Sequence, residues 1–548
     1  MNFETLPEEW DLIVVGGGIT GAGILREAAR MNLRVLLLEQ KDFAWGTSSR
    51  STKLVHGGLR YLKEGRFLLT RDAVKERERL LKDAPGLVKQ LEFLVPIYKD
   101  RGPGRWVLEA GLSIYDLIAH KRQHRFYPPA EFIKLLPHID QKGLSGGFSF
   151  YDAQVDDARL VLRLINEAVQ FGGRALNYTT VTKIIRNSTG EVIGIEAEDT
   201  ETRKVQTLVT GAVINATGVW AEMLHPSPDP KLHLRPLRGS HLIFPYDVLP
   251  IDYAVSFIHP VDSRAVFAIP WEGIVLVGTT DLDHGDDLSL EPAVSKEEVL
   301  YLLEGLRALF PAFDILPKNI QATFAGVRPI LSEGKLAPSE ESREHVVWKD
   351  KGLVTITGGK LTTFRKLALD ALNAAKPFFP PVKFNDPNDP VVLPASPTLE
   401  KPDNLSSDIW QNLVGRYGQS AEELVRTAAP EDLAVIPGTQ TLWAELPFAA
   451  KHEQVRHLSD LLLRRVRIGL LTPRGGKAYF RRIQELCEPV LPWGRRQWKQ
   501  EIKMYVDQWK YAYSLPEKTI DEICAQQQSL ILKFIELLMF YYRKLFPA

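Results

Sequence analysis

The chain has 548 residues, of which 68 are basic and 68 acidic, so its formal net charge is zero. This length exceeds what one hydrophobic core usually supports, and we expect two or three domains. The charge balance excludes a strongly basic chain of the kind that binds nucleic acid, and no nucleic-acid partner is expected.

The cysteine content and the N-terminal sequence indicate a cytoplasmic protein. Only Cys487 and Cys524 occur, which excludes a disulfide framework and favours a reducing compartment. Neither cysteine has metal-ligand spacing, and no metal is expected. Residues 1–10 lack the basic and apolar regions of a secretory signal, and no segment offers the roughly 20 uncharged apolar residues of a spanning helix.

The segment from Asp11 to Glu39 has the pattern of a dinucleotide-binding unit. In its G-x-G-x-x-G the first glycine permits a tight turn, the second lets backbone N–H groups approach a pyrophosphate, and the third packs helix against strand. The helix N-terminus favours the anionic pyrophosphate, and the acid after the second strand suits a ribose hydroxyl. A glycine-rich turn in an unrelated α/β protein is the alternative, but the complete order of elements favours a cofactor that contains ADP. The elements are a strand at Asp11–Val15, the glycines Gly16, Gly18 and Gly21, a helix at Ile19–Met31, a strand at Arg34–Leu38, and Glu39.

Beyond this unit, strand-like and helix-like segments follow one another. Arg264–Pro270 with Gly273–Val277 predicts an antiparallel hairpin. We place an antiparallel sheet mostly between Leu232 and Gln321, with a contribution from Leu91–Phe150. Strands are predicted at Leu176–Ile185, Glu191–Glu198 and Lys204–Asn215, and helices at Ala158–Phe171, Lys296–Leu309, Asp408–Tyr417, Ser420–Ala428, His452–Ile468, Gly475–Glu488 and Arg495–Tyr513.

Two segments decide between FAD and a nicotinamide cofactor. Val213–Trp220 is a predicted buried strand ending in Ala-Thr-Gly, as is familiar from FAD-binding Rossmann proteins. Val354–Ala368 repeats the strand–glycine–helix order, and a helix N-terminus there would stabilise the negative charge of reduced flavin. No second G-x-G-x-x-G follows, although a flavoprotein reduced by NAD(P)H would commonly need one. Each segment alone fits ordinary strand punctuation, but together they favour FAD.

A Pro- and Asp-rich run at Lys376–Asp403 opposes a helix or a central strand and is predicted to be a linker. The expected fold class is mixed α/β: a Rossmann-type FAD-binding domain interrupted by an antiparallel-sheet substrate domain, followed by a C-terminal all-α domain. The expected division is an FAD-dependent oxidoreductase unit at 1–375 (FAD-binding at about 1–90, 150–230 and 322–375, substrate-binding at about 91–149 and 231–321), a linker at 376–403, a helical domain at 404–516 and an amphipathic tail at 517–548.

Several motifs are spread through the large unit. The longest are TSSRSTKLVHGGLRYL at Thr47–Leu62 and YDAQVDDARL at Tyr151–Leu160. Shorter ones are GSH at Gly239–His241, IPW at Ile269–Trp271, VGTTD at Val277–Asp281, GVRP at Gly326–Pro329 and GGKLTT at Gly358–Thr363. Together they closely resemble, in the same order, the bacterial FAD-dependent glycerol-3-phosphate dehydrogenases, a family of D-amino-acid-oxidase-like flavoproteins. The resemblance extends through the helical unit to about Pro516, whereas the tail from Glu517 has no counterpart.

The resemblance implies oxidation of sn-glycerol 3-phosphate to dihydroxyacetone phosphate by hydride transfer to FAD, with electrons passed to a membrane quinone. Some relatives give the electrons to oxygen, and those oxidases tend to carry a long insertion ahead of the GGK segment. Here only Leu331–Lys351 lies between, which favours the dehydrogenase. Another amine- or amino-acid-oxidase-like flavoenzyme and a non-catalytic flavin-binding protein are the alternatives, but neither needs a cluster of cations.

The substrate phosphate is best held by Arg, whose planar fork donates two hydrogen bonds, with Lys as a point charge. By the resemblance, Arg60, Arg328 and Lys360 converge on the substrate, with Tyr61 as a further donor. Structural alternatives are a helix cap for Arg60 and Tyr61, an internal ion pair for Arg328 and a solvated side chain for Lys360. Because separate motifs each contribute a cation, we favour substrate binding and count Arg328 and Lys360 among the catalytic residues.

The substrate hydroxyl must also lose a proton, and a base that works near neutral pH points to histidine. His56 in LVHGG and His241 in GSH lie inside the matched motifs. His56 is expected against the flavin, whereas His241 is expected to contact substrate and is slightly preferred as the base. A packed, hydrogen-bonded histidine is the ordinary alternative for both.

The FAD contacts are expected to be non-covalent, because no cysteine or histidine is clearly placed for a flavin link. The fingerprint glycines serve the pyrophosphate and Glu39 the adenosine ribose. Lys53 and Leu54 are expected beside the isoalloxazine, and Val181 beside the adenine. The hydroxyl residues after Gly46 are expected to donate to phosphate or flavin oxygens, although turn chemistry also explains them. The remaining expected contacts are Thr47, Ser48, Ser49, Gly218, Trp220, Gly359, Leu361 and Thr362.

The tail contains an unusual segment, SLILKFIELLMFYYRKLF at Ser529–Phe546. Ser529, Lys533, Glu536 and Arg543 recur at helical spacing as a narrow polar stripe beside a wide apolar face. This pattern predicts a helix lying in a membrane interface; a helix docked on the protein or pairing in a homodimer is the alternative. Because a quinone reductase must reach the bilayer, we favour peripheral association with the inner face of the cell membrane.

Overall fold

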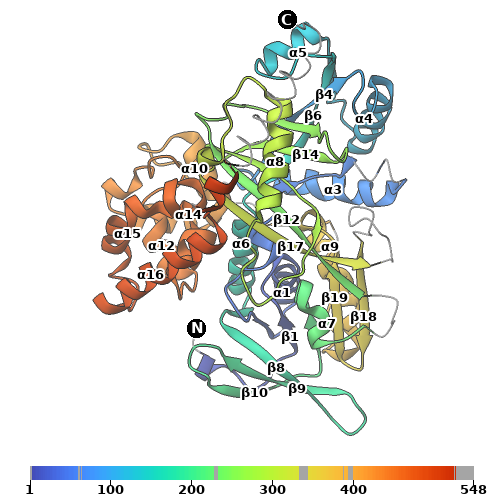
Figure 1. Ribbon diagram of the computed structural model, residues 1–548. Helices are drawn as coiled ribbons and strands as arrows, with labels where there is room; N and C mark the ends of the chain where they lie inside the picture. Colours follow the sequence, from blue (N-terminus) through green and yellow to red (C-terminus); the bar gives the residue numbers. More distant parts are fainter. Residues whose placement is uncertain are drawn as a thin grey trace, which may run out of the picture.

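A mostly parallel sheet lies at the centre of the large unit in the computed structural model, which describes residues 3–59, 62, 65–227, 233–332, 344–386, 388–392, 399–516, 518–523 and 525 (Figure 1). The predicted βαβ unit is confirmed: β1 (Leu12–Val15) and β2 (Val35–Leu38) pair in parallel and α1 (Ile19–Arg30) connects them. Every residue of both strands is buried, as expected for a sheet covered on both faces. The order of this sheet is β18 (His345–Asp350), β19 (Leu353–Gly358), β11 (Val213–Asn215), β1, β2 and β7 (Arg174–Leu176), with β18 antiparallel to β19.

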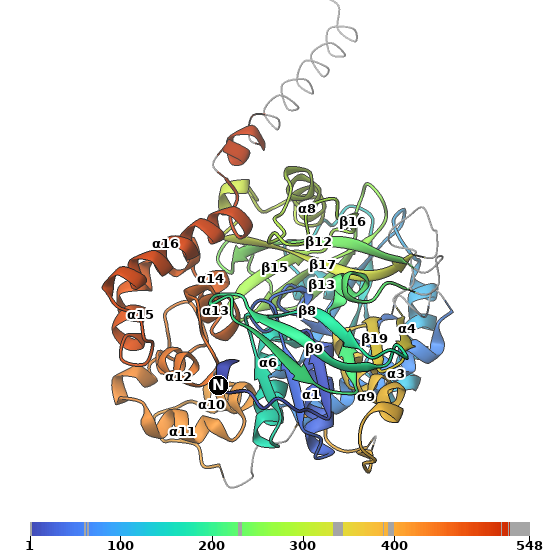
Figure 2. The same cartoon turned by 90° about the horizontal axis from the view of Figure 1, so that it is seen from below.

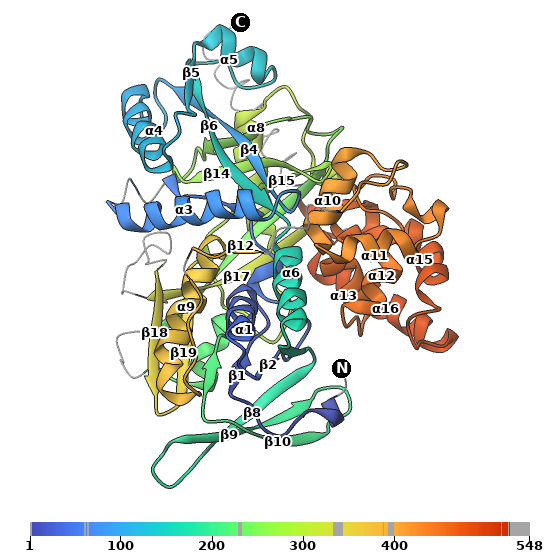
Figure 3. The same ribbon diagram turned by 180° about the vertical axis from the view of Figure 1, so that it is seen from behind.

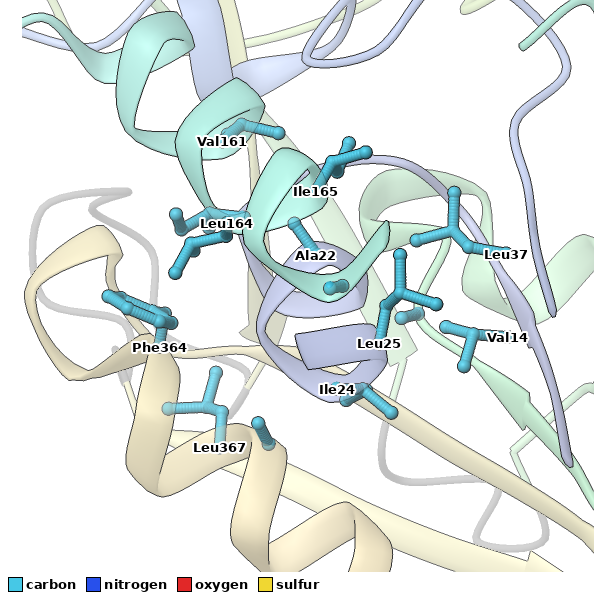
Figure 4. Close-up of a cluster of buried hydrophobic side chains, with 14 of the residues drawn as sticks. Val14, Ala22, Ile24, Leu25, Leu37, Val161, Leu164, Ile165, Phe364 and Leu367 are labelled. Atoms are coloured by element: carbon cyan, nitrogen blue, oxygen red, sulfur yellow. The ribbon is translucent and has the colours of Figure 1, made fainter. Parts of the chain in front are cut away.

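Three helices and the sheet share one hydrophobic core. α1 lies between α6 (Asp157–Gln170) and α9 (Phe364–Ala375), and their apolar side chains meet those of β1 and β2 (Figure 4). A Cβ at Gly23 would come within 2.8 Å of the Phe364 ring, so α1 and α9 approach as closely as they do only because glycine stands there. The helix predicted at Ala158–Phe171 is α6, with both ends shifted by one residue.

The second sheet is mainly antiparallel. The predicted hairpin is confirmed, since β14 (Ala265–Trp271) and β15 (Ile274–Gly278) pair antiparallel with Trp271 opposite Ile274. The sheet order is β16 (Leu282–Asp283), β12 (His233–Pro245), β15, β14, β13 (Ala254–Ile258), β4 (Val88–Tyr98), β6 (Leu144–Val155) and β3 (Leu54–Val55), and β5 (Arg125–Tyr127) pairs with β6. α3 (Phe67–Asp83), α4 (Arg105–Ala119) and α5 (Pro129–Leu135) lie around its β4–β6 end (Figure 3).

The antiparallel sheet extends beyond its expected end at Gln321. β17 (Ala322–Ser332) pairs with β12 along its whole length, so the GVRP motif belongs to this sheet and not to the Rossmann core. The helix predicted at Lys296–Leu309 is α8, with the same bounds. Its start is well defined because Ser295 and Glu298 form a reciprocal capping box.

The strand predicted at Lys204–Asn215 is wrong as a single element. The chain forms β10 (Val205–Val209) in a small sheet with β8 (Thr179–Arg186) and β9 (Val192–Asp199), and then enters β11 of the central sheet. Between them the Thr210 hydroxyl accepts a hydrogen bond from the Ala212 N–H at 3.2 Å, which stabilises the turn. β-branched residues on both sides conceal this break in the sequence pattern.

The C-terminal unit is helical and packs on one side of the large unit (Figure 2). The helix predicted at His452–Ile468 is wrong: one helix ends at His452, and Leu461–Arg465 forms a π-helical turn. The chain then continues through Arg467 in the left-handed region, with φ of 54°. The helices are α10 (Ser407–Tyr417), α11 (Ser420–Thr427), α12 (Glu445–His452), α13 (Leu458–Asp460), α14 (Ile468–Leu471), α15 (Phe480–Cys487) and α16 (Arg495–Ala512).

Buried ion pairs join the two units and explain this irregular backbone. Arg464 and Arg465 both donate to the carboxylate of Asp42, which follows β2. Arg467 donates to Asp156 at 2.9 Å and also to Asp157, at the N-terminus of α6. Two consecutive arginines, both on the π-helical turn, thus reach the same carboxylate.

The described part of the expected linker packs against the large unit. Val391 and Val392 are buried in the core around α1, and Arg365 of α9 donates to the Asp386 carbonyl at 2.9 Å. The described residues of this run therefore lie against the large unit. In the part of the chain that the structure describes, no helix is long and apolar enough to cross a membrane.

Candidate functional site

A cavity of about 1280 Å³ lies between the carboxyl ends of the central strands and the antiparallel sheet. Ligands of open α/β sheets bind at this edge, and the volume exceeds the roughly 300–1,000 Å³ of a typical small-molecule site. The wall passes from Glu39 and Val181, through Gly16, Gly18, Thr47 and Ser48, to Leu54, His56, Gly218, Trp220, Arg328, Gly359, Lys360, Leu361 and Thr362.

The fingerprint loop brings backbone close to the cavity. Gly16 has φ of 108°, and a Cβ on it would lie 2.6 Å from the Ala216 carbonyl oxygen. A Cβ on Gly21 would lie 1.9 Å from the carbonyl oxygen of Gly16, so the third glycine serves helix–strand packing and does not line the cavity. The first N–H of α1, at Ile19, donates to the Ser48 hydroxyl at 2.9 Å. This end of the cavity thus has the helix N-terminus and small hydroxyl group that suit a pyrophosphate.

Glu39 lies at the carboxyl end of β2, as its position in the pattern predicts. Its carboxylate accepts hydrogen bonds from the N–H groups of Gly17 at 2.6 Å and Lys41 at 2.9 Å. Burial raises the pKa of Glu39, although these two N–H groups oppose the effect. The carboxylate is therefore fixed in orientation at the wall beside Val181, where a ribose hydroxyl would be held.

Cationic side chains also line the cavity. The guanidinium of Arg328, on β17, donates to Asp281 at 3.0 Å and to the Thr279 hydroxyl at 2.9 Å. Arg328 is thus both an ion-pair partner and a cavity-wall residue, which combines the two interpretations of the sequence. Lys360 lies at the start of the 3₁₀ turn Leu361–Thr363 that leads into α9, and it also lines the cavity. Arg60 and Tyr61 lie outside the described residues.

The two histidines occupy different positions. His56 lines the cavity, and its backbone N–H donates to the Thr362 hydroxyl at 3.2 Å. His241 is 1% exposed and stacks on Phe324 with ring centroids 4.6 Å apart. Burial, followed by the positive charges of Arg328 and Lys53, lowers the pKa of His241 well below its ordinary value. His56 thus lines the cavity, whereas the ring of His241 is buried and is not part of the lining.

His241 still communicates with the cavity through one neighbour. Its Nε2 lies 3.0 Å from the hydroxyl of Thr52, and Thr52 lines the cavity. Its Nδ1 has no hydrogen-bond partner among the described residues. The His241 ring is therefore neutral, because a charged imidazolium here would be shielded from water and close to the two cations Arg328 and Lys53.

Lys53 is not among the residues that line the cavity. Its side chain is fully buried and its Nζ donates to Asp157 at 2.8 Å and to the Ser49 carbonyl at 2.6 Å. Burial is the largest influence on Lys53 and lowers its pKa to about 8, although Asp157 opposes it. Ser49 is likewise buried behind the wall, whereas Leu54 lines the cavity. The partner of Lys53, Asp157, lies far along the chain, so the motif around Lys53 does not by itself indicate that the side chain is buried.

Two protein families match this chain, one after the other along the sequence. Residues 11–365 match the family described as FAD dependent oxidoreductase, and residues 357–498 match the C-terminal domain of alpha-glycerophosphate oxidase. The chain belongs to the FAD-dependent oxidoreductases. It is 32% identical to the aerobic glycerol-3-phosphate dehydrogenase of Staphylococcus haemolyticus, over 86% of this chain and 88% of that one. It is 34% identical to glycerol-3-phosphate dehydrogenase 2 of Mycobacterium tuberculosis, over 91% and 88%.

Solved structures of this family agree in fold. The chain superposes on the glycerol-3-phosphate dehydrogenase of Bacillus halodurans complexed with FAD with a TM-score of 0.71, at 26% identity, covering 92% of this chain and 96% of that one. The resemblance recognised from the motifs, the mixed α/β fold with its C-terminal helical domain, and FAD as cofactor are therefore confirmed.

As an FAD-dependent oxidoreductase, the protein offers a wall that fits its cofactor. The cavity lining includes a fixed carboxylate that suits a ribose, a helix N-terminus that suits a pyrophosphate, and apolar residues such as Leu54 and Leu361. The Gly16 backbone could not approach so closely with any side chain present. These features suit an elongated ligand with an anionic middle.

Sequence reasoning missed several residues of the wall. Thr279 and Asp281 fix the Arg328 fork and Thr52 connects to His241, yet none was singled out. The VGTTD motif contained the signal for the first two. Arg50 pairs with the buried Glu291 and donates to the Tyr513 hydroxyl at 3.2 Å, so the end of the C-terminal helical domain supports the cavity wall. That contact spans more than 400 residues and has no local signature.

FAD is expected to be released when the purified yellow protein is precipitated with acid. The described wall contains no cysteine, and the contacts above provide ample non-covalent binding. The measurement is the flavin absorbance of the supernatant against that of the pellet. Colour retained in the pellet would mean covalent attachment, contrary to this expectation.

Proposed function

We propose that the protein oxidises sn-glycerol 3-phosphate to dihydroxyacetone phosphate and passes the electrons to a membrane quinone. The observation that carries the proposal is the Arg328 fork, held at the cavity wall by Asp281 and Thr279. A planar guanidinium in fixed orientation suits a dianionic phosphate. The relatives named aerobic glycerol-3-phosphate dehydrogenases support this choice of substrate.

Lys360 supplies the second charge of the phosphate site. Its place at the start of the turn before α9 combines an ammonium group with the positive end of a helix. Together, Arg328 and Lys360 hold the phosphate and orient the substrate so that its secondary alcohol faces the flavin end of the cavity. Arg60 and Tyr61, which lie outside the described residues, are proposed as further donors to the phosphate.

His56 is proposed as the base that takes the hydroxyl proton. It lines the cavity, and its backbone is fixed to Thr362 at the segment that precedes α9. Bound FAD supplies the acceptor for the hydride. His241 is proposed to act through the Thr52 hydroxyl: its neutral ring, 3.0 Å from that hydroxyl, holds it in place at the cavity wall.

The FAD-contact assignments are proposals supported by position on the cavity wall. Glu39 and Val181 serve the adenosine end, and Leu54 lies at the flavin end. Lys53 and Ser49 are proposed to act only through the backbone and by holding the loop that carries Thr47 and Ser48. The other proposed contacts are Gly16, Gly18, Gly218, Trp220, Gly359, Leu361 and Thr362, with Gly21 supporting the turn.

The domain division is likewise proposed, with one change suggested by strand pairing. The FAD-binding parts are about 1–90, 150–230 and 344–375, because β17 and its GVRP motif lie in the sheet of the substrate-binding part. The linker at 376–403 then leads into the helical domain at 404–516. Peripheral attachment to the inner membrane face follows from the quinone acceptor. The segment Ser529–Phe546, for which a membrane-interface helix or a homodimer contact is predicted from sequence, lies outside the described residues.

Anaerobic mixing with glycerol 3-phosphate tests the substrate. Flavin absorbance near 450 nm is expected to bleach, as hydride transfer to flavin requires. His56→Asn is expected to slow the bleaching more than His241→Asn does. Unchanged absorbance with the wild-type protein would contradict the proposal, and bleaching by an amino acid instead would favour an amino-acid-oxidase-like enzyme.

Reoxidation of the reduced protein separates the electron acceptors. A short-chain quinone is expected to restore the flavin absorbance much faster than dissolved oxygen. The short interval Leu331–Lys351 supports the dehydrogenase, because the oxidases tend to carry a long insertion there. Faster reoxidation by oxygen would favour the oxidase.

A further inference from the structure

α4 presents a broad apolar face to solvent. Trp106, Val107 and Leu117 are 76%, 67% and 74% exposed. A contiguous group of exposed large apolar side chains is unusual on a soluble surface and marks an interaction site. Ile114 and the exposed small residues Ala110 and Ser113 complete the face at helical spacing.

The acidic residues of α4 are turned away from this face. The carboxylate of Asp116 accepts hydrogen bonds from the backbone N–H groups of Gln123 at 2.8 Å and His124 at 3.2 Å, and the His124 ring lies 2.7 Å from it. The other ring nitrogen of His124 lies 3.3 Å from Glu109. The segment after the helix thus occupies both carboxylates along one flank, and the exposed face itself carries no charge.

Positive charges border the face at both ends. Arg101 and Arg105 precede or begin the helix, and Lys121 and Arg122 follow it, all of them exposed. Lys121 is paired with Glu78 of α3, so Arg101, Arg105 and Arg122 carry the charge argument. The nearest acid at the first end is Asp100. An apolar face between basic ends is complementary to a bilayer with anionic headgroups, and each basic residue near such a surface contributes about 1 kcal/mol.

The face continues into the flavin cavity. Val107 and Ile114 belong both to the exposed face and to the cavity wall, and Phe67 at the start of α3 does the same. α4 lies on the opposite side of the molecule from the C-terminal helices in all three views (Figures 1, 2 and 3). A membrane on this face would therefore meet the cavity without meeting the helical domain.

We propose that the α4 face docks on an anionic lipid bilayer and sets the mouth of the flavin cavity against the membrane. The proposal rests on the proposed function, because a quinone is reached through lipid. With 15 residues, α4 is about 22 Å long, shorter than the roughly 30 Å hydrocarbon core, so it lies along the interface.

Vesicle flotation of the full-length holoenzyme tests the surface. The probes are vesicles of phosphatidylcholine alone and of phosphatidylcholine with phosphatidylglycerol. Trp106→Glu combined with Leu117→Glu is expected to lower binding to the anionic vesicles by roughly tenfold or more, since two apolar side chains become charged. Wild-type binding is expected to weaken in high salt and on the uncharged vesicles. Neither residue lines the cavity, so turnover of glycerol 3-phosphate with a soluble dye should stay unchanged.

A matched control changes two exposed apolar residues elsewhere. Val205 and Val209 on β10 are 53% and 48% exposed and lie at the far end of the molecule from α4 (Figure 1). Val205→Glu with Val209→Glu is expected to leave vesicle binding at the wild-type level. An equal loss in both double variants would overturn the proposal, because general charge would then explain it.

Other occupants give other results. If the α4 variant binds vesicles as wild type does but converts a dimer to a monomer in sedimentation, a second copy covers the face and the proposal fails. It also fails if truncation after Pro516 abolishes binding while α4 is intact. If binding depends on α4 but glycerol 3-phosphate does not bleach the flavin, the surface stands and the proposed substrate fails.

Discussion

Replacing Arg328 by Ala is expected to lower kcat/KM for glycerol 3-phosphate by roughly 30- to 1000-fold, with FAD still bound. The loss corresponds to about 2–4 kcal/mol for one charge-assisted contact to a dianion. Lys360→Ala is expected to fall in the same range. The measurement is steady-state turnover with a soluble dye, together with the flavin absorbance of each variant, which reports FAD content.

Arg328→Lys is expected to restore only part of the activity. Lysine keeps the charge but not the planar fork that Asp281 and Thr279 orient. Arg203→Ala is a matched control, because that side chain is 75% exposed in a distant turn, and it should stay within about twofold of wild type. Near-normal kinetics in both the Arg328 and the Lys360 variants would remove them from the substrate site.

The parts of the fold that the sequence predicts well are those in which local signals agree. α8 has its predicted bounds because Ser295 and Glu298 cap a helix of regular apolar spacing. The βαβ unit follows from glycine spacing and two apolar strands. In each case the residues that decide the structure lie within a few positions of one another.

The parts that the sequence does not predict depend on partners far along the chain. Lys53 reads as a cavity residue until Asp157 is placed beside it. His241 lies in a matched motif, but the stacked ring of Phe324 and the neighbouring cations fix its burial and its lowered pKa. β17 belongs to a sheet whose other strands all precede it, some of them by more than 200 residues. Pattern alone cannot supply these pairings.

The ion pairs between the two units show the same limit most clearly. Asp42 lies in a loop after the cofactor-binding strand, and nothing near it suggests a buried charge. Its carboxylate accepts hydrogen bonds from Arg464 and from Arg465, and from the Asn177 amide at 2.9 Å. Burial alone would raise its pKa, but Arg465 and Arg464 outweigh this and hold the pKa of Asp42 well below its ordinary value. The C-terminal domain is thereby fixed beside the loop that carries Trp45 and Thr47.

Asp42→Asn is expected to destabilise the protein by about 3–5 kcal/mol, because two buried guanidinium groups lose their shared counter-charge. The measurement is the urea midpoint followed by tryptophan fluorescence, with Trp493 and Trp498 reporting from the C-terminal domain. Glu485→Gln is a suitable control, since it removes only exposed pairs with Arg481 and Arg482 on the same helix, each worth about 0.5 kcal/mol or less.

The same variant carries a definite pH dependence. The folded pKa of Asp42 is depressed, so its contribution to stability is present above the unfolded pKa of about 3.9 and is lost as pH falls through the folded value. The difference in urea midpoint between wild type and Asp42→Asn should therefore be constant between pH 5 and 8 and shrink below about pH 4. A difference that instead grows on acidification, or is absent at neutral pH, would show that Asp42 does not hold the two units together.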